Sequence, residues 1–249
     1  MHIYDYAWLG VDYNQRKIPY LAALSPEKWS FGSNNDYSIL KSYVIHTFDK
    51  VYDEGKITEA GSNYSVFNTG LFTQHYEGIY AYFCQNVAGE KSKWKLSGFY
   101  TEYQLSSLGV CNYPKRANYF ADPAELIFDI NCPIYLQYTH ILNNEENRNR
   151  IPESLRNDPN IQSLFDGAVR RAQSMIQANY KTAVPQYHKG NIQLLIPIFL
   201  ISPLVPDLAL VLSKNNEGTA YMGHTCLTIE MAYNNARLIA RPDSVWLRP

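Results

Sequence analysis

The densest group of reactive side chains lies near the C-terminus. It contains His224, Glu230, Asn234, Asn235 and Arg237. A neutral imidazole can act as base or acid near neutral pH, a guanidinium can hold phosphate through two parallel bonds, and amides can bind a base or ribose edge. We therefore expect His224, Glu230 and Arg237 to be catalytic, and Asn234 and Asn235 to bind substrate. The alternative is that His224 is a hydrogen-bonded core histidine and the two amides cap a turn.

A second group that could bind a nucleotide follows the proline at 114. It combines Lys115 and Arg116 with the ring of Tyr119. Cations beside an aromatic ring suit a phosphate and a stacked base together, although a solvated loop has the same composition. Lys181 joins the predicted substrate-binding residues because it precedes two apolar strands that can carry it to a cleft. Its position in the last turn of a predicted helix is also explained by the helix dipole.

Several kinds of chemistry are excluded by missing motifs. The chain has no phosphate-binding P-loop, no dinucleotide-binding glycine turn, no serine-hydrolase elbow and no zincin helix. The stretch 140–152 is rich in Asn, Glu and Arg but lacks metal-ligand spacing, so no metal site is expected and no cofactor is named. The dipeptides His46-Thr47 and His224-Thr225 argue against a paired-histidine phosphoesterase, because that chemistry places each histidine and its hydroxyl two residues apart on a strand.

Composition narrows the class of protein without identifying a partner. The 22 basic and 23 acidic residues give a net charge of -1, so no electrostatic footprint marks nucleic acid. The 21 tyrosines suit base stacking or half-buried strands. The four cysteines form no C-x-x-C pair and are expected to be reduced, mostly buried thiols. The N-terminus resembles no signal peptide, and prolines interrupt the apolar stretch 192–212, so we expect a cytoplasmic protein without a membrane partner.

The elements that must position these residues follow from the hydrophobic periodicity. Helices are expected at 35–54, 159–182 and 231–239, with Ser33 or Asn35 capping the first and Asp158 the second. A hairpin is expected over 77–100, and further strands at 133–139, 192–200, 208–212 and 221–229. Pro197 predicts an edge or a bulge in its strand. The predicted fold is α+β, a single domain over 1–249 with a mainly antiparallel sheet flanked by helices.

Five separated phrases of the sequence form a recognisable set, namely Phe67–Leu71, Glu77–Phe83, Arg116–Asp129, Asn179–Tyr187 and Ala232–Ile239. In this order they resemble a bacterial domain-of-unknown-function family, DUF3825. The resemblance implies association with RNA-binding modules of the cold-shock and LOTUS type, and it transfers no catalytic residues. Together with the reactive groups above, it predicts an enzyme that hydrolyses or transfers phosphoesters or phosphoanhydrides on RNA ends or nucleotides. The alternative prediction is a non-catalytic RNA-binding or nucleotide-binding module.

Overall fold

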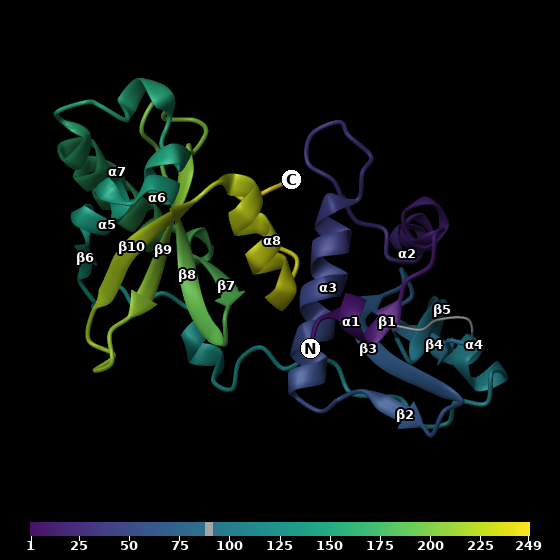
Figure 1. The fold of residues 1–249 in the computed structure, drawn as a ribbon. Helices are drawn as coiled ribbons and strands as arrows, with labels where there is room; N and C mark the ends of the chain where they lie inside the picture. The colour runs from purple at the N-terminus through teal and green to yellow at the C-terminus, as the bar shows by residue number, and fades with distance from the viewer. Residues whose placement is uncertain (88–91) are drawn as a thin grey trace. The chain divides into compact units, whose positions relative to one another are not determined.

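The computed structural model describes residues 1–87 and 92–249, which divide into two compact units, 1–118 and 119–249. Each unit contains its own five-stranded sheet with helices against it (Figure 1). The α+β class and the mainly antiparallel pairing are confirmed. The prediction of one sheet is wrong, because the hairpin at 77–100 and the C-terminal strands belong to different sheets. That residues 1–249 form one domain stays a prediction.

The sheet of the first unit has the order β1-β5-β4-β3-β2, and only its β1–β5 pair is parallel. Its strands are β1 (Ala7–Trp8), β2 (Thr58–Ala60), β3 (Tyr64–Phe72), β4 (Gly78–Gln85) and β5 (Trp94–Thr101). The predicted hairpin is confirmed as β4 and β5. The connection between these two strands includes residues 88–91, which lie outside the described residues.

Helix α3 (Ser38–Asp53) covers this sheet and confirms the first predicted helix. Its predicted apolar arc is buried, and the ring of Phe48 packs edge-on against Phe67 of β3 with ring centroids 5.3 Å apart. The predicted caps are wrong, since the chain enters the helix through Tyr37 at a φ of 54° and the Asp36 carboxylate accepts a bond from the Ser38 amide. The unit's other helical segments are α1 (Ile3–Tyr6), a π-helix (Tyr13–Lys17), α2 (Ile18–Leu24) and α4 (Glu102–Ser107).

The family phrase Phe67–Leu71 forms an irregularity in β3. Pairing with β4 shifts register between Asn68 and Phe72, and Gly70 has a φ of 72°. The Thr69 hydroxyl donates to the Ile79 carbonyl at 2.6 Å, and the Gly70 amide donates to the Asn68 side chain at 2.8 Å. A Cβ on Gly70 would lie 2.8 Å from the Tyr43 hydroxyl. The residue types of this phrase are therefore explained by the backbone conformation of β3, and no ligand is needed to account for them.

The sheet of the second unit has the order β6-β10-β9-β8-β7, and only its β6–β10 pair is parallel. Its strands are β6 (Ile134–Leu136), β7 (Val184–His188), β8 (Asn191–Ile198), β9 (Leu208–Lys214) and β10 (Tyr221–Leu227). The predicted antiparallel apolar strands are confirmed as β8 and β9. Pro197 pairs only with β9 among the described strands, because pairing with β7 reaches no further than Leu195. The prediction of an edge strand or a bulge is thus wrong, because β8 lies between β9 and β7 and its pairing with β9 is regular at Pro197. The proline is tolerated because it lies beyond the end of β7.

Helices cover both faces of this second sheet (Figure 1). Helices α5 (Tyr138–Asn143), α6 (Glu145–Arg150) and α7 (Ile161–Ala178) lie on one side, and α8 (Ile229–Ile239) lies on the other. Phe165 of α7 and Ile141 of α5 share one buried cluster with Ile196 and Leu210 of the sheet. Asp158 is not the cap of α7, since Asn160 holds that position and donates its amide to the Asp158 carboxylate. Short 3-10 turns cover Pro123–Leu126, Glu153–Leu155 and Tyr180–Thr182.

The cysteines are free thiols, and the prediction that most are buried is only half right. Cys132 and Cys226 are buried, while Cys84 is partly exposed and Cys111 is exposed. Within the described ranges, no helix combines the length and apolar character needed to cross a bilayer.

Candidate functional site

His224 occupies a bulge in β10. Pairing with β9 is regular up to Gly223 and resumes at Thr225, so His224 is the extra residue between them. Regular alternation along the predicted strand at 221–229 would place His224, Cys226 and Thr228 on one face, but the structure does not. The bulge interrupts the alternation, and Thr228 is already the N-cap of α8, with its hydroxyl accepting a bond from the Met231 amide.

The nearest titratable partner of His224 is His140 of α5. The two ring centroids lie 6.2 Å apart with an angle of 66° between the ring planes. His140 is exposed and His224 is half-buried, so both rings are near solvent. The structure thus forms a histidine pair, but with His140 in place of His46, which lies on α3 of the first unit.

Asn147 of α6 contacts both histidine residues of this pair and is only 2% exposed. Its side-chain nitrogen lies 3.1 Å from Nδ1 of His140 and 3.4 Å from the backbone carbonyl oxygen of His224. Its side-chain oxygen accepts a bond from Arg150 at 3.1 Å. Because a guanidinium can only donate, this bond fixes the orientation of the Asn147 amide. The side-chain nitrogen also lies 3.2 Å from the backbone carbonyl oxygen of His140, so the buried amide contacts both histidine residues.

Arg150 adds a positive charge next to the pair. Its Nη1 donates to the backbone carbonyl of Cys226 at 2.8 Å, and its Nη2 lies 3.6 Å from the carboxylate of Glu146. Arg150 is mostly buried and Glu146 is largely exposed, so solvent screens the acid more than the base. Arg150 is consequently the less screened charge of this ion pair.

Burial lowers the pKa of His224 below its usual value of 6.5, and the neighbouring His140 lowers it further. Both effects disfavour the imidazolium form. His224 is therefore neutral at pH 7 and can accept a proton.

The predicted residues Asn235 and Arg237 lie on α8, which packs on the other face of the sheet. Asn235 donates to Gln186 of β7 at 3.1 Å, Gln186 donates to Gln193 at 2.9 Å, and Gln193 donates to the Ser213 hydroxyl at 2.9 Å. We call this row the amide chain. Arg237 is only 7% exposed. The structure does not bring the predicted catalytic residues His224 and Arg237 together, because the sheet separates the His140–His224 pair from α8.

The other two predicted residues of α8 have different surroundings. Glu230 is exposed in the first turn of α8, where the positive end of the helix dipole stabilises its carboxylate. Asn234 is half-buried, and within the part of the chain that the structure describes its side-chain oxygen is buried without a hydrogen-bond partner.

The remaining predicted substrate-binding residues occupy three further places. Tyr119 lines a cavity of about 610 Å³ together with Gln193 and Lys214, and its ring lies edge-on to Tyr187 with centroids 4.9 Å apart. Lys181 forms an ion pair at another cavity. Lys115 and Arg116 are exposed in the first unit, in the segment that follows α4.

Sequence reasoning missed His140, Asn147 and Arg150 as partners of His224. They lie in the stretch that was considered only for metal binding. Across the described residues, no group of three or more His, Cys, Asp or Glu side chains is placed to hold a metal ion. The available signal was the spacing of three residues between Asn147 and Arg150, which puts a buried amide and a cation on one helix face.

A family model described as a domain of unknown function, DUF3825, matches residues 21–246. The chain belongs to this family. The DUF3825 match runs through both sheets and includes His140, Asn147, Arg150 and His224. No curated protein and no solved structure matches the chain. A bacterial origin of this DUF3825 chain stays a prediction.

Proposed function

We propose that this DUF3825 chain is an enzyme that hydrolyses or transfers phosphoesters or phosphoanhydrides on RNA ends or nucleotides, with His140 and His224 moving the protons. One observation carries the proposal: two imidazoles lie 6.2 Å apart near solvent, a buried amide contacts one of them, and a half-buried guanidinium is bonded to that amide. Acid–base catalysis needs each ring within about 2.6–3.2 Å of the proton it moves, and two rings at this spacing can reach opposite sides of one phosphoryl group.

The reaction step assigns one role to each ring. Neutral His224 takes the proton of the attacking water or hydroxyl as its oxygen forms a bond to phosphorus. The bond from phosphorus to the leaving oxygen breaks, and protonated His140 gives its proton to that oxygen. The charge that develops on the phosphoryl oxygens is stabilised by Arg150, which takes the role that the sequence assigned to Arg237.

The nucleotide substrate class rests on two supports. The family resemblance implies partners that bind RNA. The cavity beside Tyr119, whose lining does not include His140 or His224, offers an aromatic ring next to the ammonium of Lys214. Stacking on an aromatic ring accepts every base, so a tyrosine there suits RNA of varied sequence.

The test compares purified variants on a panel of phosphorylated substrates. The panel holds an RNA oligonucleotide with a 3′-phosphate, a 2′,3′-cyclic phosphate or a 5′-triphosphate, and free nucleoside mono-, di- and triphosphates. We expect turnover of at least one substrate to fall about 10²- to 10⁴-fold in His224→Ala and in His140→Ala, the usual effect of losing a proton-transfer group. His75→Ala, in an exposed turn of the first unit, is the matched control and is expected to retain full turnover.

The second candidate function is a non-catalytic RNA-binding or nucleotide-binding module, and the Tyr119 cavity is the observation that favours it. In that case no substrate of the panel turns over, and His224→Ala binds labelled RNA as tightly as the unaltered chain while Tyr119→Ala binds it more weakly. That combination of results would contradict the enzyme proposal.

A further inference from the structure

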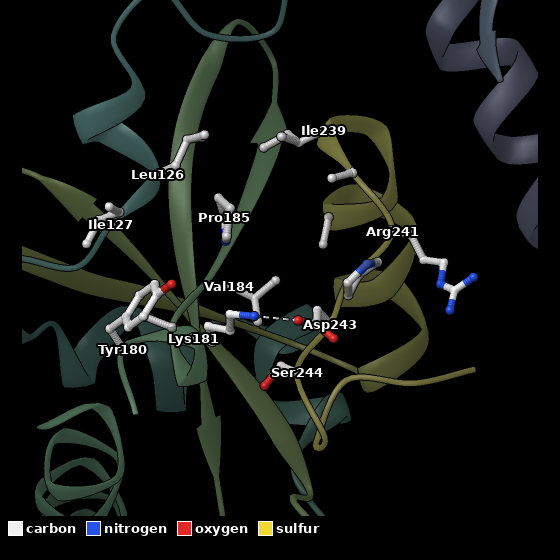
Figure 2. Close-up of a pocket in the computed structure, with 14 residues that line it drawn as sticks. Leu126, Ile127, Tyr180, Lys181, Val184, Pro185, Ile239, Arg241, Asp243 and Ser244 are labelled. Carbon is white, nitrogen blue, oxygen red and sulfur yellow. Dashed lines mark hydrogen bonds and ion pairs between the residues drawn. The ribbon is translucent and has the colours of Figure 1, made fainter. Parts of the chain in front are cut away.

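A second pocket lies at the β7 edge of the second sheet, with a volume of about 260 Å³ (Figure 2). Its walls come from the segment around Ile127, from the start of β7 at Val184 and Pro185, and from the end of α8 at Ile239. Strands β8 and β9 separate β7 from β10, which places the two strands about 14 Å apart at the usual strand spacing. The pocket is therefore distinct from the His140–His224 pair.

An ion pair supplies the polar edge of this pocket. Lys181 Nζ lies 2.7 Å from an oxygen of Asp243, and Figure 2 shows the two side chains joined directly by this contact. Asp243 raises the pKa of Lys181, and Lys181 lowers the pKa of Asp243, so both groups are charged at neutral pH. Their side chains are 51% and 78% exposed, and an exposed pair of this kind is held weakly enough to exchange partners with a ligand.

The rest of the lining is apolar and has unusually exposed large side chains. Ile127 is 53% exposed and Tyr180 is 60% exposed, and both belong to the pocket wall. Large apolar groups that stay exposed in a concavity are typical of ligand sites. The Tyr180 ring lies at one end of the pocket beside Lys181, where a planar ligand can stack on it (Figure 2).

The C-terminal segment that carries Asp243 is held in place on both sides. Helix α8 precedes it, and after it the Trp246 indole donates to the Thr182 carbonyl at 2.8 Å while Leu247 is fully buried. On the facing wall, the Asn179 side chain accepts a bond from the Lys181 amide at 3.1 Å. The pocket is thus formed before any ligand arrives, which lowers the entropic cost of binding.

These features restrict the ligand to one class. Lys181 and Arg241 outnumber Asp243 in the lining, which disfavours a bare cation, and the apolar walls favour a flat ring whose edge presents an acceptor next to donors. A carboxylate has two oxygens that accept from two parallel N–H groups, and among the common bases only guanine presents two neighbouring N–H donors beside a carbonyl. We propose that this pocket binds a guanine base, with Asp243 accepting from its N1–H and N2–H groups, Lys181 donating to O6, and Tyr180 stacking on the ring.

The test is calorimetric titration of the full chain with guanosine, inosine, adenosine and inorganic phosphate. Guanosine is expected to bind tightest, and inosine, which lacks the amino group, at least about tenfold more weakly because one bond to the carboxylate is lost. Adenosine and phosphate are expected to show no saturable binding. Equal binding of guanosine and adenosine, saturation by phosphate alone, or no saturable guanosine binding would each overturn the proposal.

The variant that isolates the recognition is Asp243→Asn, at a largely exposed side chain whose replacement leaves the core intact. It is expected to weaken guanosine at least about tenfold and to reduce the preference over inosine, because an amide cannot accept both bonds. Asp53→Asn, at a 71% exposed aspartate of the first unit, is the control and should bind guanosine like the unaltered chain. Unchanged guanosine binding by Asp243→Asn would refute the assignment. His224→Ala should also leave this binding intact, so a failure here is distinguishable from a failure of the phosphoester chemistry.

Discussion

At the scale of single residues, His224 combines access to solvent with a burial that keeps it neutral. A solvent-exposed histidine titrates near pH 6.5, whereas burial and the neighbouring His140 lower the pKa of His224. A base with a lowered pKa stays deprotonated in mildly acidic solution. The acidic limb of the pH–rate profile of kcat/KM is therefore expected below pH 6.5.

The same shift predicts how stability depends on pH. Between the lowered pKa of His224 and 6.5, the unfolded chain binds a proton that the folded chain does not, so folded-state stability falls as the pH decreases through this window. His224→Asn removes this contribution, and the loss of unfolding free energy between pH 7.5 and 5.5 should be smaller in the variant. Urea denaturation at both pH values measures it. His75→Asn should keep the original pH dependence, and an unchanged dependence in His224→Asn would rule out the assignment.

At the scale of the elements, the irregularity in β3 shows how a family phrase can be structural. Gly70 has a φ that only glycine adopts at little cost, and the space where a Cβ would lie is taken by the Tyr43 hydroxyl. The hydrogen bonds of Asn68 and Thr69 support this conformation. The phrase thus fixes the contact between β3 and helix α3.

Gly70→Ala tests this explanation. The added methyl group meets the Tyr43 hydroxyl and forces a left-handed backbone, so we expect a loss of about 1–3 kcal/mol in the free energy of unfolding. Chemical denaturation provides the value. Gly61→Ala is the matched control, since Gly61 has a φ of 59° but nothing within 4 Å of the added Cβ. If both variants lose the same stability, the contact with Tyr43 contributes nothing.

The elements that could be predicted are those whose signal is local. Helix α3 shows its apolar arc in the sequence, and β8 and β9 are apolar runs joined by a short connection, so both were predictable. The parallel pairing of β6 with β10 was not, because it joins segments far apart in the chain. The same holds for the site: the bulge at His224 and its contact with His140 depend on that pairing, and no periodicity within either segment shows it.

At the scale of the whole molecule, the second unit contains a complete core of its own. The buried cluster that includes Phe128, Phe165 and Leu210 is built entirely from residues 119–249. A chain of this length is in the usual range of independently folding domains. The sequence could not show the division into two units, because no linker-like composition marks position 118.

Residues 119–249 are therefore expected to fold when expressed alone, with one cooperative thermal transition. Circular dichroism against temperature tests cooperativity, and NMR titration of the imidazole protons tests whether His224 keeps its lowered pKa. The full chain serves as reference. A broad, non-cooperative transition, or a His224 that titrates like a free imidazole, would show that this unit depends on the rest of the chain.

The amide chain across the second sheet has a consequence for engineering. Each side chain in it donates a hydrogen bond to the next, from Asn235 through Gln186 and Gln193 to Ser213. Glutamate is nearly the same shape as glutamine but offers only acceptors when ionised. In Gln193→Glu the Ser213 hydroxyl would therefore donate to residue 193 instead of accepting from it. The substitution would reverse the direction of the last hydrogen bond in the amide chain while keeping the shape of the side chain.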